Sequence, residues 1–104
     1  MEIGELEEKV LLAILQKGEG AHGAAVRDAL KQAGRDVTVG ALWVTVDRLE
    51  KKGFVVGRED EVPSPRGGKL RRFFRVTGEG SDALRKSDEM RSKLRLPLLA
   101  GGGA

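Results

Sequence analysis

The sequence predicts a mainly α-helical domain that carries one small β-hairpin, and three observations predict this fold class. Apolar residues recur at helical spacing in three successive segments. The period changes to two after Gly53, and the turn-forming sequence PSPRGG at Pro63–Gly68 separates two strand-like segments. At 104 residues, the chain has the size of a single domain.

The first half of the chain predicts three short helices. The first spans residues 6–16, and the second spans residues 21–33 and ends at Gly34. Their apolar faces consist of Leu6, Val10, Leu11, Ile14 and Leu15 in the first helix and Ala25, Val26, Ala29 and Leu30 in the second. Because the second helix is rich in alanine, a neighbouring helix can approach it closely.

The third helix begins after Thr38, a residue type that caps helix N-termini, and ends at Gly53. Its predicted buried face consists of Val39, Leu42, Val46 and Leu49. The opposite face then consists of Gly40, Ala41, Val44, Thr45 and Arg48. A plain surface helix carries more Glu and Lys, so this small face indicates that something large packs against it.

A hairpin and a final helix complete the prediction. The first strand starts at Phe54 and the second spans Lys69–Val76. Thr77 is the expected N-cap of a helix over residues 78–96, which Pro97 ends, and residues 97–104 are expected to be a disordered tail. The apolar or small residues of that helix are spaced by 4, 3 and 4 positions, at Ala83, Ser87, Met90 and Leu94.

The net charge of +3 is unevenly distributed along the chain. Residues 1–53 hold 8 bases and 9 acids, whereas residues 54–104 hold 11 bases and 7 acids. Five bases fall within ten residues that contain no acid: Arg66, Lys69, Arg71, Arg72 and Arg75. Such a concentration is typical of a surface that binds a polyanion.

Three helices followed by a two-stranded hairpin form a winged helix-turn-helix. In this fold the third helix enters the major groove of DNA and the hairpin lies along the neighbouring backbone. If about four of the five hairpin bases contacted phosphate, counterion release alone would give a log–log salt slope near −3.6 per subunit. The candidate DNA-binding residues are Thr38, Gly40, Ala41, Trp43, Thr45 and Arg48 on the helix and Arg66, Lys69, Arg71 and Arg72 on the hairpin.

Four segments resemble the PadR-like family of transcriptional regulators over residues 5–84. They are GELEEKVLLAIL at Gly4–Leu15, GAHGAAVRDAL at Gly20–Leu30, VGALWVTVDRLEKKGFV at Val39–Val55 and RGGKLRRFFRVTGEG at Arg66–Gly80. The last two segments, in this order and spacing, carry most of the resemblance. It implies a homodimeric repressor that binds double-stranded DNA, and a small aromatic effector as a candidate partner.

The resemblance also implies that the C-terminal helix supplies much of the dimer contact. The chain therefore divides into a DNA-binding domain at residues 1–77 and a dimerisation helix at residues 78–96. The candidate interface residues are Leu6, Val10, Ala83, Ser87, Met90 and Leu94.

The chain departs from the family pattern at three places. Trp43 stands where tyrosine is usual, and its indole N–H can donate a hydrogen bond but accept none. His22 and Ala24 replace residues around a frequently aromatic position, and Phe73 and Phe74 replace a frequent tyrosine pair. A position in the core or a dimer interface, a contact to the DNA backbone and a position in a ligand pocket all remain open for Trp43. A cap or surface position is expected for His22.

Several classes of protein are disfavoured. The chain has no cysteine and one histidine, so we expect no disulfide, no metal site, no cofactor and a cytoplasmic location. No apolar run approaches the ~18 residues that span a membrane. An enzyme would need a nucleophile with its base or a phosphate-binding loop, and GGK at Gly67–Lys69 lacks the residues of such a loop. The remaining alternative is a winged-helix protein-interaction module, which has no need of an acid-free basic hairpin strand.

Overall fold

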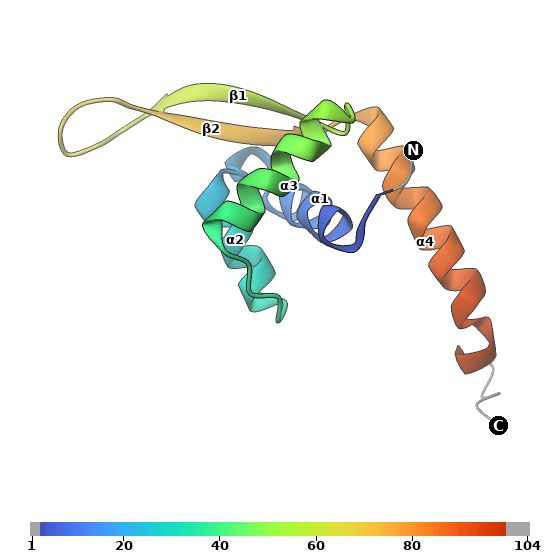
Figure 1. Cartoon of the computed structure of the whole chain (residues 1–104). Helices are drawn as coiled ribbons and strands as arrows, with labels where there is room; N and C mark the ends of the chain where they lie inside the picture. The colour runs from blue at the N-terminus through green and yellow to red at the C-terminus, as the bar shows by residue number, and fades with distance from the viewer. Residues whose placement is uncertain (1–2, 100–104) are drawn as a thin grey trace.

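A computed structural model describes residues 3–99 (Figure 1). Figure 1 shows three helices gathered at the base of a hairpin, whose tip extends away from them, while the last helix leaves on the other side. The predicted fold class is confirmed. In order, the elements are α1 (Glu5–Lys17), the 3-10 turn η1 (Gly18–Gly20), α2 (Gly23–Gln32), α3 (Val39–Lys51), β1 (Val55–Val62), β2 (Lys69–Val76) and α4 (Gly78–Leu99).

The core lies between the three helices and the base of the hairpin. Leu42, Val46 and Leu49 of α3 are buried, as the helical spacing predicts. Phe74 of β2 has the largest fully buried side chain, so burial of apolar surface joins the hairpin to the helices. Other large, fully buried side chains are Val10, Leu11, Ile14, Val26 and Val55.

Side-chain caps begin three of the helices. Thr38 Oγ1 accepts a hydrogen bond from the Ala41 amide at 3.1 Å, and Thr77 Oγ1 accepts one from the Gly80 amide at 3.0 Å. Both caps agree with the sequence prediction. His22 Nδ1 accepts from the Ala25 amide at 3.4 Å, so the expected cap position of His22 is confirmed as well.

The hairpin is antiparallel, with Val55 opposite Val76 and Val62 opposite Lys69. The second predicted strand has the bounds that the sequence indicates. On its other edge β2 pairs with the chain after η1, because the Phe74 amide donates to the Ala21 carbonyl at 2.8 Å. The base of the hairpin is therefore hydrogen-bonded on both edges of β2.

Three sequence predictions about burial are wrong. Val39, expected on the buried face of α3, is 50% exposed because the first helical turn extends beyond the core. Thr45, expected on the outward face, is buried, and its hydroxyl donates to the Ala41 carbonyl at 2.8 Å. Val10 is fully buried within its own protomer, so it cannot contribute an exposed side chain to a dimer interface.

The end of the last helix also differs from the prediction. We expected Pro97 to end it after residue 96, but α4 continues to Leu99. A proline removes one amide donor and can kink a helix without ending it. Residues 97–99 are thus helical, and residues 100–104 of the expected disordered tail lie outside the described residues.

Candidate nucleic-acid interface

The outward stripe of α3 is the first part of the candidate interface. We use this name for Val39, Gly40, Trp43, Val44, Asp47 and Arg48, all of which are exposed. They recur at the spacing of one helix face. Val39 and Val44 are about half exposed, so the N-terminal half of the stripe is apolar and its C-terminal half is charged. Apart from Trp43, the side chains of the stripe are small or flexible, which suits a helix that enters a major groove.

The N-terminus of α3 is open to solvent. Thr38 is exposed, and a Cβ added at Gly40 would meet no atom within 4 Å. Ala41 is half-buried and packs against the core, so its contribution to the interface is limited to its backbone. Thr38 and Gly40 thus lie where a DNA backbone can approach closely.

Trp43 is packed on one side and exposed on the other. Its ring meets the Phe74 ring edge-on at 5.7 Å, and a Cβ added at Gly23 would lie 3.2 Å from it. Trp43 remains 40% exposed. The ring thereby joins α2, α3 and β2, and its outer edge lines a shallow groove of about 370 Å³ together with Val44, Val46, Asp47, Glu50 and Arg72.

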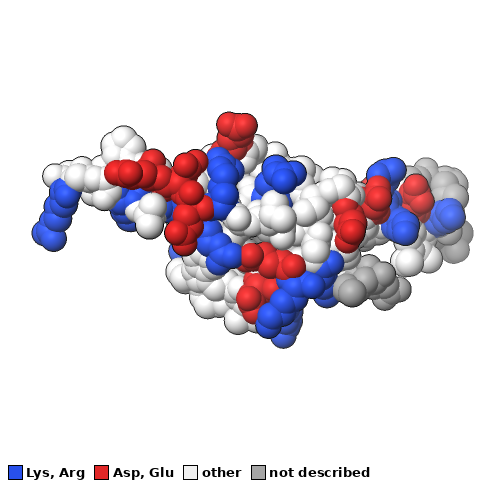
Figure 2. Space-filling view, turned by 90° about the horizontal axis from the view of Figure 1, so that it is seen from above, with Lys and Arg blue, Asp and Glu red and all other residues white. Residues whose placement is uncertain are grey.

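The hairpin carries bases on β2 and acids on β1. Glu59 lies opposite Arg72, and Asp60 lies opposite Arg71. Figure 2 shows acidic and basic side chains beside one another along the hairpin and a basic side chain at its far end. The basic segment is free of acids in sequence but not in space, so the absence of acids no longer argues against a protein-interaction module. At the tip, Arg66 and Lys69 are exposed and have no ion pair among the described residues.

Arg72 is held by an acid of α3. Its Nη2 donates to both carboxylate oxygens of Glu50, at 2.7 and 2.6 Å. Its guanidinium also lies 5.4 Å from the centre of the Phe74 ring. Strand alternation places Arg72 on the same hairpin face as Phe74, toward α3. Arg72 is thus oriented and largely neutralised by the protein itself, a pairing that sequence reasoning missed.

Arg71 lies on the opposite face of the hairpin and meets the cap of α2. Its Nη1 is 3.4 Å from His22 Nε2. Burial of the imidazole, and then the positive charge of Arg71, lower the pKa of His22 below its ordinary value. The neutral ring keeps Nδ1 available to accept the Ala25 amide. Arg71 is half-buried, so its guanidinium is partly ordered before any partner binds.

The predicted dimer residues fall into two groups. Leu6 and Ala83 are half-buried and pack against the core of their own protomer, and Ser87 bonds to Glu8 of α1. Met90 and Leu94 are 57% and 76% exposed on α4. The second group therefore offers apolar surface that the protomer itself does not cover.

Two other kinds of site receive no support from the described part of the chain. Within residues 3–99, no helix is both long and apolar enough to cross a membrane. The same residues contain no group of three or more side chains that could hold a metal ion.

The model of the transcriptional regulator PadR-like family matches residues 11–86. The chain belongs to the PadR-like family of transcriptional regulators. This PadR-like chain is 32% identical over 80 residues to the Transcriptional regulator Rv3488 of Mycobacterium tuberculosis, an alignment that covers 77% of this chain and 71% of that protein.

Solved structures agree with this PadR-like fold. A PadR family transcriptional regulator from Eggerthella lenta is 28% identical, with a TM-score of 0.67 over 86% of this chain and 79% of that one. A protein from Streptococcus mutans is 20% identical, with a TM-score of 0.73 over 95% of this chain and 91% of that one, which shows the shared fold. The PadR-like protein is a DNA-binding transcriptional regulator with a winged-helix domain.

Proposed function

We propose that this PadR-like regulator is a homodimeric repressor that binds a pseudo-palindromic operator, one half-site per protomer. The observation that carries the proposal is the position of the exposed stripe of α3 beside a hairpin whose tip presents Arg66 and Lys69 to solvent. A groove-sized helix flanked by unpaired bases fits base edges and phosphates at the same time.

The contacts divide by kind. Thr38, Gly40, the Ala41 backbone and Trp43 approach the DNA backbone, and Arg48 reaches base edges. On the hairpin, Arg66, Lys69 and Arg71 contact phosphates independently of sequence. Arg72 contributes little while Glu50 holds it. Thr45 supports the helix from inside rather than contacting DNA.

The dimer is proposed to form through the exposed apolar side chains of α4, Met90 and Leu94. They lie four residues apart, on one face of the helix. Burying them against the same residues of a second protomer removes apolar surface from water, and a two-fold axis would bring two copies of α3 to successive half-sites. The small aromatic effector stays a prediction that no contact in the described residues supports.

Selection of bound sequences from random duplex DNA tests the proposal. The purified protein is expected to enrich an inverted repeat whose half-site centres lie about 10 base pairs, or a multiple of that, apart. An enriched site without a repeat would contradict the homodimer. No enrichment at moderate salt would overturn sequence-specific binding and favour the protein-interaction module.

A further inference from the structure

The first half of α4 is packed and the second half is not. Gly80 is buried against the Phe54 backbone, and Ala83 and Leu84 pack against the core. From Asp88 to Arg95 every residue is exposed. Figure 1 shows α4 leaving the body as a separate rod, and the molecule measures 62 × 26 × 22 Å. The direction of this rod therefore depends on contacts near its middle.

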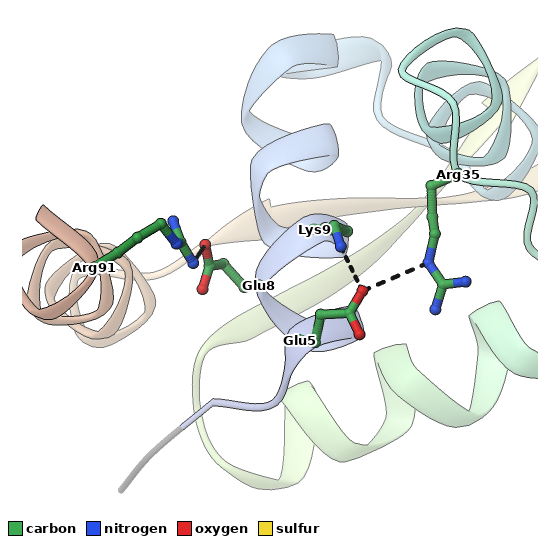
Figure 3. Close-up of polar contacts among 5 residues, drawn as sticks. All are labelled: Glu5, Glu8, Lys9, Arg35 and Arg91. Carbon is green, nitrogen blue, oxygen red and sulfur yellow. Dashed lines mark hydrogen bonds and ion pairs between the residues drawn. The ribbon is translucent and has the colours of Figure 1, made fainter. Parts of the chain in front are cut away.

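One buried carboxylate makes such contacts. Glu8 of α1 is only 9% exposed. Ser87 Oγ donates to its Oε2 at 2.6 Å, and Arg91 Nη2 donates to its Oε1. Ser87 and Arg91 lie one turn apart, so both donate hydrogen bonds to Glu8 from the same face of α4. We call Glu8, Ser87 and Arg91 the clasp, and Figure 3 shows Glu8 extended toward Arg91.

The charge state of Glu8 agrees with this arrangement. Burial raises the pKa of its carboxyl, but the hydrogen bonds from Ser87 and Arg91 outweigh burial, and the pKa lies below its ordinary value. The carboxylate is thus ionised at neutral pH. A buried ion that keeps its charge needs its partners, since leaving it unpaired is costly.

Two neighbouring acids of α1, Glu5 and Glu7, connect the start of this helix to α3 and to the loop before α3. Lys52, at the end of α3, donates from Nζ to Glu7 Oε1 at 2.8 Å. Arg35, in the loop before α3, lies 3.9 Å from Glu5 (Figure 3). The first turns of α1 therefore contact both ends of the α3 region on one side and α4 on the other.

We propose that Glu8 is a positioning residue which, through Ser87 and Arg91, fixes the direction of α4 relative to α3. In the homodimer of the proposed function, this direction sets the distance and rotation between the two DNA-reading helices. The clasp thereby makes the protein selective for one spacing between half-sites. This second step rests on the proposed function, whereas the first concerns a single protomer.

Distances within one protomer test the first step. Because the chain has no cysteine, Gln16→Cys on α1 and Lys93→Cys on α4 introduce two unique sites for spin labels. The doubly labelled chain is diluted into an excess of unlabelled chain. Double electron–electron resonance then measures the distance between the two spin labels within one protomer. The intact clasp is expected to give one narrow distribution.

Two variants open the clasp from opposite sides. Ser87→Ala with Arg91→Ala removes both donors from exposed or half-exposed positions, and Glu8→Ala removes the acceptor. Both should broaden or shift the distribution, while circular dichroism shows that the helices persist. Asp82→Ala with Arg85→Ala is the matched control, because it removes an ion pair that lies within α4 itself. A distribution unchanged in both clasp variants overturns the proposal.

Operator spacing tests the second step. Changing the spacer of the enriched inverted repeat by two base pairs rotates one half-site by about 70° about the DNA axis. The protein with an intact clasp should lose about tenfold or more in affinity, and the clasp variants should lose much less. Affinity for an isolated half-site should be the same for all chains. If the clasp variants are as selective for spacing as the unaltered protein, this second step is contradicted. If the unaltered protein prefers no inverted repeat, the proposed function is contradicted, and the distance measurement alone tests the clasp.

Discussion

Removing the Glu50 side-chain charge should strengthen DNA binding by releasing Arg72. Both carboxylate oxygens of Glu50 bind Arg72 Nη2, and the Arg72 side chain is 43% exposed, so it can turn toward a phosphate once Glu50 no longer holds it. Glu50→Gln keeps the size of the side chain. Since exposed ion pairs contribute at most about 1 kcal/mol, the variant should stay folded.

The magnitude follows from counterion release. Each new phosphate contact adds about 0.9 to the steepness of the log–log dependence of affinity on salt, so a dimer that gains two contacts gains about 1.8. Between 0.2 and 0.05 M salt, Glu50→Gln should therefore gain about 12-fold more affinity than the unaltered protein does. Fluorescence anisotropy of a labelled operator over a salt series measures both quantities.

Three further variants make the assay decisive. Glu89→Gln removes an exposed acid of α4 and should leave the salt slope unchanged. Lys69→Ala should reduce the steepness by about 1.8 per dimer, whereas Arg72→Ala in the otherwise unaltered chain should change it little. An unchanged slope in Glu50→Gln, or equal losses in Lys69→Ala and Arg72→Ala, would refute the reasoning that Glu50 neutralises Arg72.

Three other predictions concern stability and assembly. Burial and Arg71 lower the folded-state pKa of His22 below 6.5, so its contribution to stability is complete above about pH 6.5 and is lost as the pH falls through the folded-state pKa. Because Asn is a helix cap that does not titrate, His22→Asn should make the free energy of urea unfolding depend less on pH between pH 7.5 and 5.5. A pH dependence equal to that of the unaltered protein would contradict this prediction. Gly80→Ala should lower the free energy of unfolding by about 1–3 kcal/mol, because its Cβ would lie 2.4 Å from the Phe54 carbonyl oxygen. The control Gly78→Ala would meet no atom within 4 Å and should cause no loss. Equal unfolding free energies of the two variants would show that the first turn of α4 is loosely packed. Leu94→Glu should convert the dimer to monomers in sedimentation, because it places a charge at an exposed apolar position of α4. Val56→Glu, at an exposed apolar position of the hairpin, is the control and should leave the dimer intact. A Leu94→Glu protein that stays dimeric would place the interface elsewhere.

Local periodicity was sufficient to predict most of the fold. The spacing of Leu42, Val46 and Leu49 identified the buried face of α3, and Thr38 and Thr77 marked the starts of two helices. These signals are readable because capping and amphipathic burial depend on residues within one or two turns of each other.

Periodicity failed where burial depends on the neighbouring elements. Val39 continues the apolar series of α3 but lies beyond the edge of the core. Thr45 can be buried because the carbonyl of Ala41 satisfies its hydroxyl. Val10 fits any apolar helix face, and the spacing cannot distinguish the core of its own protomer from that of a partner.

The candidate site depends on pairs that no local pattern reveals. Glu50 and Arg72 are 22 positions apart, and Glu8 and Arg91 are 83 positions apart. The sequence shows a basic segment and a set of acids, but the register of the hairpin and the direction of α4 decide which charges meet. The structure therefore changes the view of the hairpin from a uniform basic strip to one in which Glu50 holds Arg72 and His22 meets Arg71, while Arg66 and Lys69 are exposed at the tip.

Hydroxyl-radical footprinting of the enriched operator, combined with native mass spectrometry of the complex, tests the central claim most directly. Two protomers per duplex and two protected segments, about one helical turn or a multiple of it apart on the same side of the DNA, are predicted. A single protomer per duplex, or protection confined to one segment, would contradict the account.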